Sequence, residues 1–163
     1  MDKTKLFLTA LEDNKGLVFK IASVYTNSID DRNDLAQEII YQFWKSFDTF
    51  REQSSVSTWL YRLAMNVAIY HLKTGKRKIQ LVPLDEQIIN FQKVENYELD
   101  EKWLVLKQHI DKLNLLDKGI VILYLEDKSY EEIGQIIGIS ASNVGTKLSR
   151  IKQKLKKQIS KEL

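Results

Sequence analysis

Residues 129–155 read SYEEIGQIIGISASNVGTKLSRIKQKL, and this stretch predicts two short helices joined by a tight turn. Ser129 and Glu132 have the spacing of a capping box, in which the hydroxyl and the carboxylate each bind a free backbone N–H group at a helix start. The first helix should therefore begin near Tyr130. Gly138 is the residue expected where a helix ends in a left-handed turn, and Gly134 is small enough to let two helices cross closely.

The second helix of this hairpin, capped by Ser140, has one apolar and one polar face. The apolar face consists of Val144, Leu148, Ile151 and Leu155. The opposite face carries Ser142, Thr146, Ser149 and Gln153, with Asn143, Arg150 and Lys154 along its flank. Hydrogen-bonding side chains on such a helix are suited to reading base edges in the major groove of DNA. The alternative is an ordinary helical hairpin whose lysine-rich face is merely solvated.

The composition is that of a soluble globular protein, with 44% hydrophobic and 29% charged residues. The absence of cysteine excludes disulfides and thiolate metal sites and fits a reducing cytoplasm. No apolar run has the length of a membrane span or of a signal-peptide core. We therefore expect a cytoplasmic protein without direct membrane insertion.

The charges are distributed unevenly along the chain, although the net charge is only +3. Residues 53–84 carry five basic and no acidic side chains, and residues 140–163 carry seven basic and one acidic. In the segment between them, acidic side chains outnumber basic ones. Two basic regions separated in this way are expected of a chain that holds nucleic acid at two places.

The remaining apolar periodicity predicts further helices and no strands. Helices are expected over residues 5–27, with Gly16 as a candidate interruption, over most of 28–50, from a cap at Ser55 or Ser57 to Thr74, and over 99–111. A fifth is expected after Leu115-Leu116-Asp117 and includes Ile120, Val121, Leu123 and Tyr124. Residues 79–98 have an irregular pattern and contain the only proline, so they read as a linker. The sequence thus predicts an all-α fold of two small helical domains, residues 1–78 and 99–163, joined by a flexible linker.

The third predicted helix has an apolar face and, beside it, a stripe that contains Arg62, Asn66 and Lys73, flanked by Trp59 and Tyr70. Aromatic rings beside cations suit unpaired nucleic acid, because a base can stack on a ring while the cation holds the phosphate. The alternative is that Trp59 and Tyr70 are core aromatics.

No candidate active site is found in the sequence. The two histidines, His71 and His109, are far apart and have no cysteine partner, so a zinc site is not expected. No phosphate-binding loop or nucleophile motif occurs. We expect a protein without cofactor or metal that is not an enzyme.

Two blocks of the sequence together resemble a known family. Residues 34–78, which contain the string TWLYRLAMN, resemble region two of the bacterial sigma-70 RNA polymerase sigma factors. Residues 113–155, which contain SYEEIG, GIS and LSR, resemble region four. Their order and the short linker are similar to the extracytoplasmic-function (ECF) group. The resemblance implies a factor that binds core RNA polymerase and directs promoter recognition, DNA melting and transcription initiation.

The resemblance also implies roles for individual residues. The positions that match the polymerase-binding helix are Asp34, Leu35, Gln37 and Glu38. The positions that match contacts to the minus-ten element are Phe50, Ser54 and Ser55, in a loop that receives a flipped base, and Trp59, Arg62, Asn66 and Lys73 on the next helix. The positions assigned to the minus-thirty-five element are Ser142, Asn143, Thr146, Ser149 and Arg150, with Lys147 as a phosphate contact. Members of the family commonly have an anti-sigma factor as a further partner.

This sequence departs from the family pattern at Gly145, where many relatives have a basic residue, and the preferred DNA sequence can differ accordingly. Gly134 replaces a common alanine. Two other functions are compatible with parts of the chain. An independent helix-turn-helix regulator, binding an operator as a dimer, accounts for residues 113–163 but not for residues 34–78. A small nucleic-acid-processing enzyme lacks a recognisable site.

Overall fold

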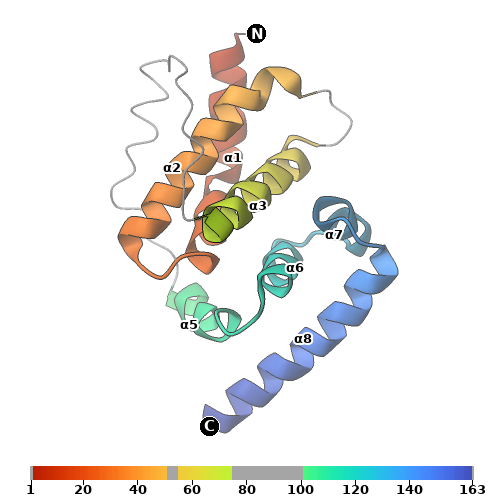
Figure 1. Ribbon diagram of the computed structural model, residues 1–163. Coiled ribbons are helices and arrows are strands. Elements are labelled where there is room, and N and C mark those ends of the chain that lie inside the picture. Colours follow the sequence, from red (N-terminus) through yellow and green to blue (C-terminus); the bar gives the residue numbers. More distant parts are fainter. Residues whose placement is uncertain (1, 51–54, 75–100, 163) are drawn as a thin grey trace. The chain divides into compact units, whose positions relative to one another are not determined.

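The structure is a computed structural model that describes residues 2–50, 55–74 and 101–162 (Figure 1). All regular elements in these ranges are helices, which confirms the predicted all-α fold. The chain divides into two compact helical units between Glu98 and Leu99. The predicted linker, residues 79–98, lies outside the described residues.

Within its described residues, 2–50 and 55–74, the N-terminal unit contains three long helices, each of which contacts the other two (Figure 1). They are α1 (Lys3–Val24), α2 (Ile29–Ser46), which a 3-10 turn η1 (Phe47–Thr49) follows, and α3 (Val56–Thr74). The largest fully buried side chains of this unit include Phe7, Leu11, Ile21, Leu35, Ile39, Phe43 and Leu60. The helix starts are capped as the sequence allows, since the Ser28 hydroxyl accepts a hydrogen bond from the Asp31 N–H group at 3.1 Å.

The first helix differs in detail from the expectation for residues 5–27, because α1 starts at Lys3, ends at Val24 and continues through Gly16. A glycine in a helix interior costs about 1 kcal/mol relative to alanine. Burial of Leu11 and Val18 on either side offsets that cost, so Gly16 does not interrupt the helix.

Residues 101–162 of the C-terminal unit form four helices, with α8 in contact with α5, α6 and α7. They are α5 (Glu101–Ile110), α6 (Leu115–Leu125), α7 (Tyr130–Ile137) and α8 (Ala141–Glu162). Its buried core includes Ile110, Ile120, Leu123, Ile133, Val144, Leu148 and Ile151. The apolar pattern predicted for the helix at 99–111 is only partly buried, because Leu104 is 45% exposed.

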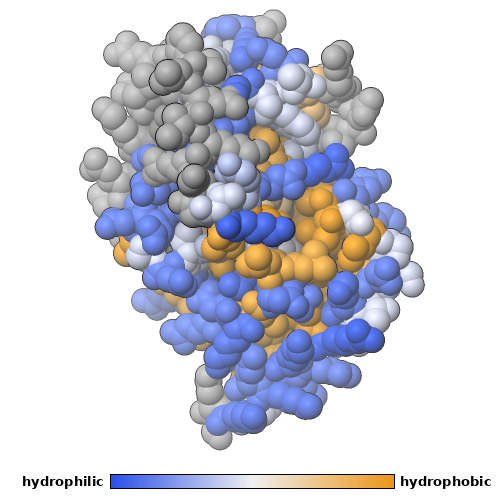
Figure 2. All heavy atoms as spheres, in the orientation of Figure 1, coloured by the Kyte–Doolittle hydropathy of each residue, from blue (hydrophilic) through white to orange (hydrophobic). Residues whose placement is uncertain are grey.

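The surface of α8 beyond Ile151 is strongly hydrophilic (Figure 2). Exposed lysines along this part of the helix are Lys152, Lys154, Lys156, Lys157 and Lys161. Across the described ranges no helix is both long enough and apolar enough to span a membrane. The same ranges contain no cluster of three or more histidine or acidic side chains that could hold a metal ion.

Candidate nucleic-acid interface

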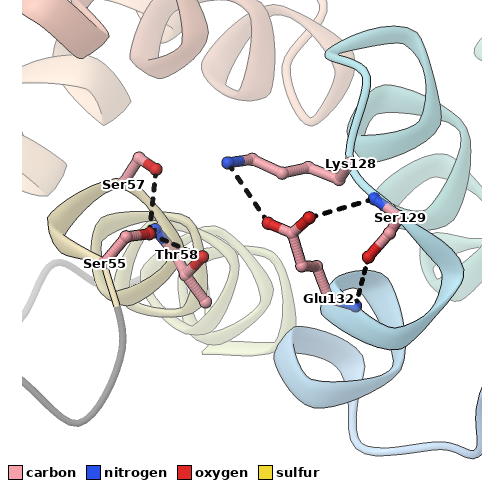
Figure 3. Close-up of polar contacts among 6 residues, drawn as sticks. All are labelled: Ser55, Ser57, Thr58, Lys128, Ser129 and Glu132. Atoms are coloured by element: carbon pink, nitrogen blue, oxygen red, sulfur yellow. Dashed lines mark hydrogen bonds and ion pairs between the residues drawn. The ribbon is translucent and has the colours of Figure 1, made fainter.

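The capping box predicted at the start of α7 is present (Figure 3). The Ser129 hydroxyl accepts a hydrogen bond from the Glu132 N–H group at 3.1 Å, and the Ser129 N–H group donates to a Glu132 carboxylate oxygen at 3.3 Å. Lys128 Nζ lies 3.7 Å from the other carboxylate oxygen. The hydrogen bond from the Ser129 backbone, followed by the Ser129 hydroxyl and the Lys128 charge, lowers the pKa of Glu132. This cap fixes the direction in which α7 leaves the preceding loop.

The turn between α7 and α8 is closed by two hydrogen bonds to one carbonyl oxygen. The N–H groups of Gly138 and Ile139 donate to the Gly134 carbonyl at 2.8 Å and 3.0 Å. Gly138 has φ 92°, the left-handed conformation expected of a helix C-terminal glycine. A Cβ atom at Gly134 would lie 2.5 Å from the Ile139 carbonyl oxygen. That position would also lie 3.5 Å from the nitrogen of Ala141, the first residue of α8, so the small Gly134 lets the turn and the start of α8 approach α7 closely.

Helix α8 leaves the turn with its polar face exposed. The Ser140 hydroxyl accepts a hydrogen bond from the Asn143 N–H group at 3.1 Å, which confirms the predicted cap. Val144, Leu148 and Ile151 are buried, and Leu155 is half-buried. The exposed candidates are Ser142, Asn143, Thr146, Ser149 and Arg150, and Lys147 is half-buried. The structure thus brings all six candidates onto the accessible side of one helix, and their contacts to DNA stay a prediction.

Two depressions adjoin this helix. An open hollow of about 580 Å³ lies over its polar face and is lined by Ser142, Thr146, Ser149 and Arg150, and also by Tyr130 from α7. A smaller depression of about 220 Å³ lies between α8 and the start of α6, where Lys147, Arg150 and Lys154 face Asn114 and Asp117. Arg150 lines both depressions, so it stands on the ridge between them.

Sequence reasoning missed Tyr130 and Tyr124 as parts of this surface. Tyr124 receives a hydrogen bond from Lys152 Nζ at 3.0 Å, and the same atom lies 4.4 Å from the centre of the tyrosine ring. That hydrogen bond raises the pKa of Lys152. Neither tyrosine lies on α8, and no spacing in the sequence indicates that α6 and α7 place these rings beside it.

The candidates on α2 differ in accessibility. Asp34 is exposed, and Gln37 and Glu38 are half-buried. Glu38 accepts a hydrogen bond from the Gln42 amide at 3.1 Å. Leu35 has an exposed fraction of 0%. Its side chain is a core residue, so the expectation that Leu35 itself makes a surface contact is corrected.

The start of α3 is capped by Ser55, which settles the choice between Ser55 and Ser57 (Figure 3). The Ser55 hydroxyl accepts a hydrogen bond from the Thr58 N–H group at 3.1 Å and also lies 3.2 Å from the Ser57 hydroxyl. Another candidate, Ser54, lies outside the described residues.

An aromatic cluster carries the next candidates. The ring centre of Phe7 lies 4.9 Å from that of Phe43, which in turn lies 5.5 Å from Trp59. Phe50 lies 5.1 Å from Trp59 at the outer end of the cluster. Phe50 and Trp59 are both half-buried. Trp59 is therefore both a packing residue and an accessible ring, whereas Tyr70 is 38% exposed and is not a core aromatic.

The polar stripe predicted on α3 is exposed. Arg62, Asn66 and Lys73 all face solvent, and none of them belongs to the apolar core. Their spacing places Asn66 one helical turn after Arg62. Trp59 precedes Arg62 by about one turn of the same helix, so an accessible ring and exposed polar groups follow one another along α3.

Comparison with known families gives two matches in the same order as the two units. Residues 10–78 match the family described as Sigma-70 region 2, and residues 104–155 match Sigma-70, region 4. The RNA polymerase sigma factor SigV of Bacillus subtilis (strain 168) is 30% identical over 161 residues, which cover 96% of this chain and 93% of SigV. The ECF RNA polymerase sigma factor SigW of the same organism is 25% identical, over 94% of this chain and 88% of SigW.

Two solved structures have a similar fold. CnrH in complex with the cytosolic domain of CnrY matches with a TM-score of 0.72 and 14% identity, over 98% of this chain and 91% of that one. The sigma factor RpoE in complex with the anti-sigma factor NepR from Bartonella quintana matches with a TM-score of 0.69 and 17% identity, over 96% of both chains.

Proposed function

Since the chain belongs to the ECF group of the sigma-70 family of RNA polymerase sigma factors, we propose that its two helical units divide promoter recognition between them. As a sigma factor it binds core RNA polymerase and directs promoter recognition, DNA melting and transcription initiation. In this division, residues 1–78 bind core polymerase and the minus-ten element, and residues 99–163 bind the minus-thirty-five element across a linker at 79–98.

The C-terminal unit reads the upstream element through α8. The single observation that carries this assignment is the exposed polar face of a capped helix-turn-helix. Ser142, Asn143, Thr146, Ser149 and Arg150 offer hydrogen-bonding groups to base edges, and Lys147 offers a charge to a phosphate. Arg150 is the main candidate for a specific contact because arginine can bind a guanine with two parallel hydrogen bonds.

The N-terminal unit captures unpaired DNA and docks on the polymerase. Phe50 and Trp59 offer ring faces, Ser54 and Ser55 belong to the loop that receives a flipped base, and Arg62, Asn66 and Lys73 hold the strand. Extrusion of a base from the stack costs a few kcal/mol, and stacking and hydrogen bonds in the protein must offset this cost. Asp34, Gln37 and Glu38 offer a polar surface on α2 for the polymerase, with Leu35 supporting them from the core.

The protein acts by binding and not by catalysis, and it works in the cytoplasm with the polymerase. We include an anti-sigma factor among its partners, since the similar RpoE chain is held by the anti-sigma factor NepR. Such a partner would compete with core polymerase or promoter DNA for the exposed surfaces of the two units.

The experiment that tests this function starts with purified chain and bacterial core RNA polymerase. We expect the chain to co-elute with core and the complex to open a promoter selected from random DNA. Binding to double-stranded DNA as a dimer, without affinity for core, would contradict the proposal and favour an operator-binding regulator.

The role of Arg150 is tested in the same assay. Arg150→Ala should weaken recognition of the minus-thirty-five element and leave binding to core unchanged. The matched control is Lys161→Ala, which removes one positive charge from the far end of the same helix. Equal loss of core and promoter binding in Arg150→Ala would refute the assignment.

A further inference from the structure

The hollow over α8 has a feature that the assigned contacts do not use. Gly145 contributes no side chain to the middle of the polar face, while its neighbours Ser142, Thr146 and Ser149 do. The hollow is open to solvent and has a volume of about 580 Å³.

The ring of Tyr130 lies beside the space that Gly145 leaves. A Cβ atom at Gly145 would lie 3.4 Å from Tyr130 Cε2 and 3.6 Å from Cδ2. The tyrosine is 40% exposed. The first residue of α7 thus forms an aromatic wall on the recognition face of α8.

Two further residues that line the hollow carry methyl groups. The Thr146 hydroxyl donates a hydrogen bond to the Ser142 carbonyl at 3.2 Å, so it can offer a base only an acceptor, while the Thr146 methyl group remains available for apolar contacts. Ala141, which also lines the hollow, adds a second methyl group. The Tyr130 ring therefore lies within van der Waals reach of the Cβ position of Gly145, and Ala141 and Thr146 also line the hollow.

The major groove presents one apolar group, the C5-methyl of thymine. Resting on the proposed function, which brings α8 into that groove, we propose that the space beside Gly145 receives the C5-methyl of a thymine in the minus-thirty-five element. Tyr130 is then a specificity-determining residue that acts through its ring. A larger side chain at position 145 would fill the space and remove the preference for a base that carries the C5-methyl group.

The test removes the methyl group alone. The holoenzyme, full chain with core polymerase, first selects its minus-thirty-five element from random DNA, and each thymine of that element is then replaced by deoxyuridine. We expect affinity to fall about threefold to tenfold at one thymine, as loss of a buried methyl group predicts, and to stay unchanged at the others. Equal affinity at every position, or a selected element without thymine, overturns the proposal.

Variants of the residues that line the hollow test whether the difference in affinity between thymine and deoxyuridine DNA arises there. Gly145→Leu and Tyr130→Ala should bind the thymine and deoxyuridine DNAs equally, while Tyr130→Phe, which keeps the ring, should retain the difference. Retention of the difference in Gly145→Leu or Tyr130→Ala overturns the assignment, and circular dichroism confirms that each variant is folded. A holoenzyme that opens no selected DNA would instead contradict the proposed function, so the two failures are distinguishable.

Discussion

Two glycines of the helix-turn-helix differ in backbone conformation: Gly138 is left-handed, and Gly145 is helical. Gly138 has φ 92° and no atom near the position of a Cβ, so alanine there meets only backbone strain. Gly145 is helical, and a Cβ there makes ordinary contact with Tyr130. Gly138→Ala should lower the free energy of unfolding by about 1–2 kcal/mol, whereas Gly145→Ala should raise it by up to about 1 kcal/mol.

Denaturant unfolding of the full chain, followed by circular dichroism, measures both variants. Wild-type protein in the same buffer is the reference. A change of the same sign in both variants would show that the backbone conformation of Gly138 does not limit its replacement.

The capping box at α7 gives a second prediction for single residues. Ser129→Ala removes the acceptor for the Glu132 N–H group and should lower the free energy of unfolding by about 1 kcal/mol. Thermal unfolding at neutral pH measures the loss. Ser160→Ala, at an exposed position near the end of α8, is the matched control and should change little.

The carboxylate of the same cap makes stability depend on pH. The Ser129 N–H group lowers the pKa of Glu132 in the folded protein. The unfolded value is about 4.3, so the stabilisation is complete above that pH and is lost as the pH falls through the lower folded pKa. Glu132→Gln should therefore flatten the pH dependence of the melting temperature in that acid range. Glu131→Gln, which changes the same charge outside the cap, should leave the dependence as in wild type.

At the scale of whole helices, the proposed function assigns both base-reading and phosphate-binding groups to α8. Lys147 is half-buried on the side of α8 that faces the start of α6. A phosphate contact releases a counterion, so Lys147→Ala should weaken binding equally on all DNA sequences and reduce the salt slope by about 1. Titrations of the holoenzyme at several salt concentrations measure the slope. The same reduction in Lys161→Ala would mean that the charge acts without a defined contact.

Short-range signals explain why helices α7 and α8 could be predicted closely. Ser129, Glu132 and Gly138 act within a few residues of one another, so their effects are visible in sequence. The contact of Tyr130 with Gly145 and the burial of Leu35 depend on packing between helices. Local spacing does not show which helices meet, and this is why Tyr130 was missed. The spacing of Leu35 from Ile39 and Phe43 does fit an apolar stripe, and its assignment to a polymerase contact came from the family resemblance.

At the scale of the whole molecule, both units carry exposed polar groups that the proposed function assigns to DNA. In the N-terminal unit Asn66 is exposed on α3, and in the C-terminal unit Arg150 is exposed on α8. Two binding units on one chain make the second contact intramolecular, so each unit can bind weakly while the holoenzyme binds a complete promoter well.

This division predicts how substitutions in the two units combine. Asn66→Ala and Arg150→Ala should each weaken promoter binding by about 1–3 kcal/mol and leave co-elution with core polymerase unchanged. Because the two side chains belong to separate units, the double variant should show the sum of the two effects within about 0.5 kcal/mol. Affinities of the four holoenzymes for one promoter at a single salt concentration complete the cycle. A coupling energy above about 1 kcal/mol would mean that contact at one element changes contact at the other, and the two units would then recognise the promoter as one surface.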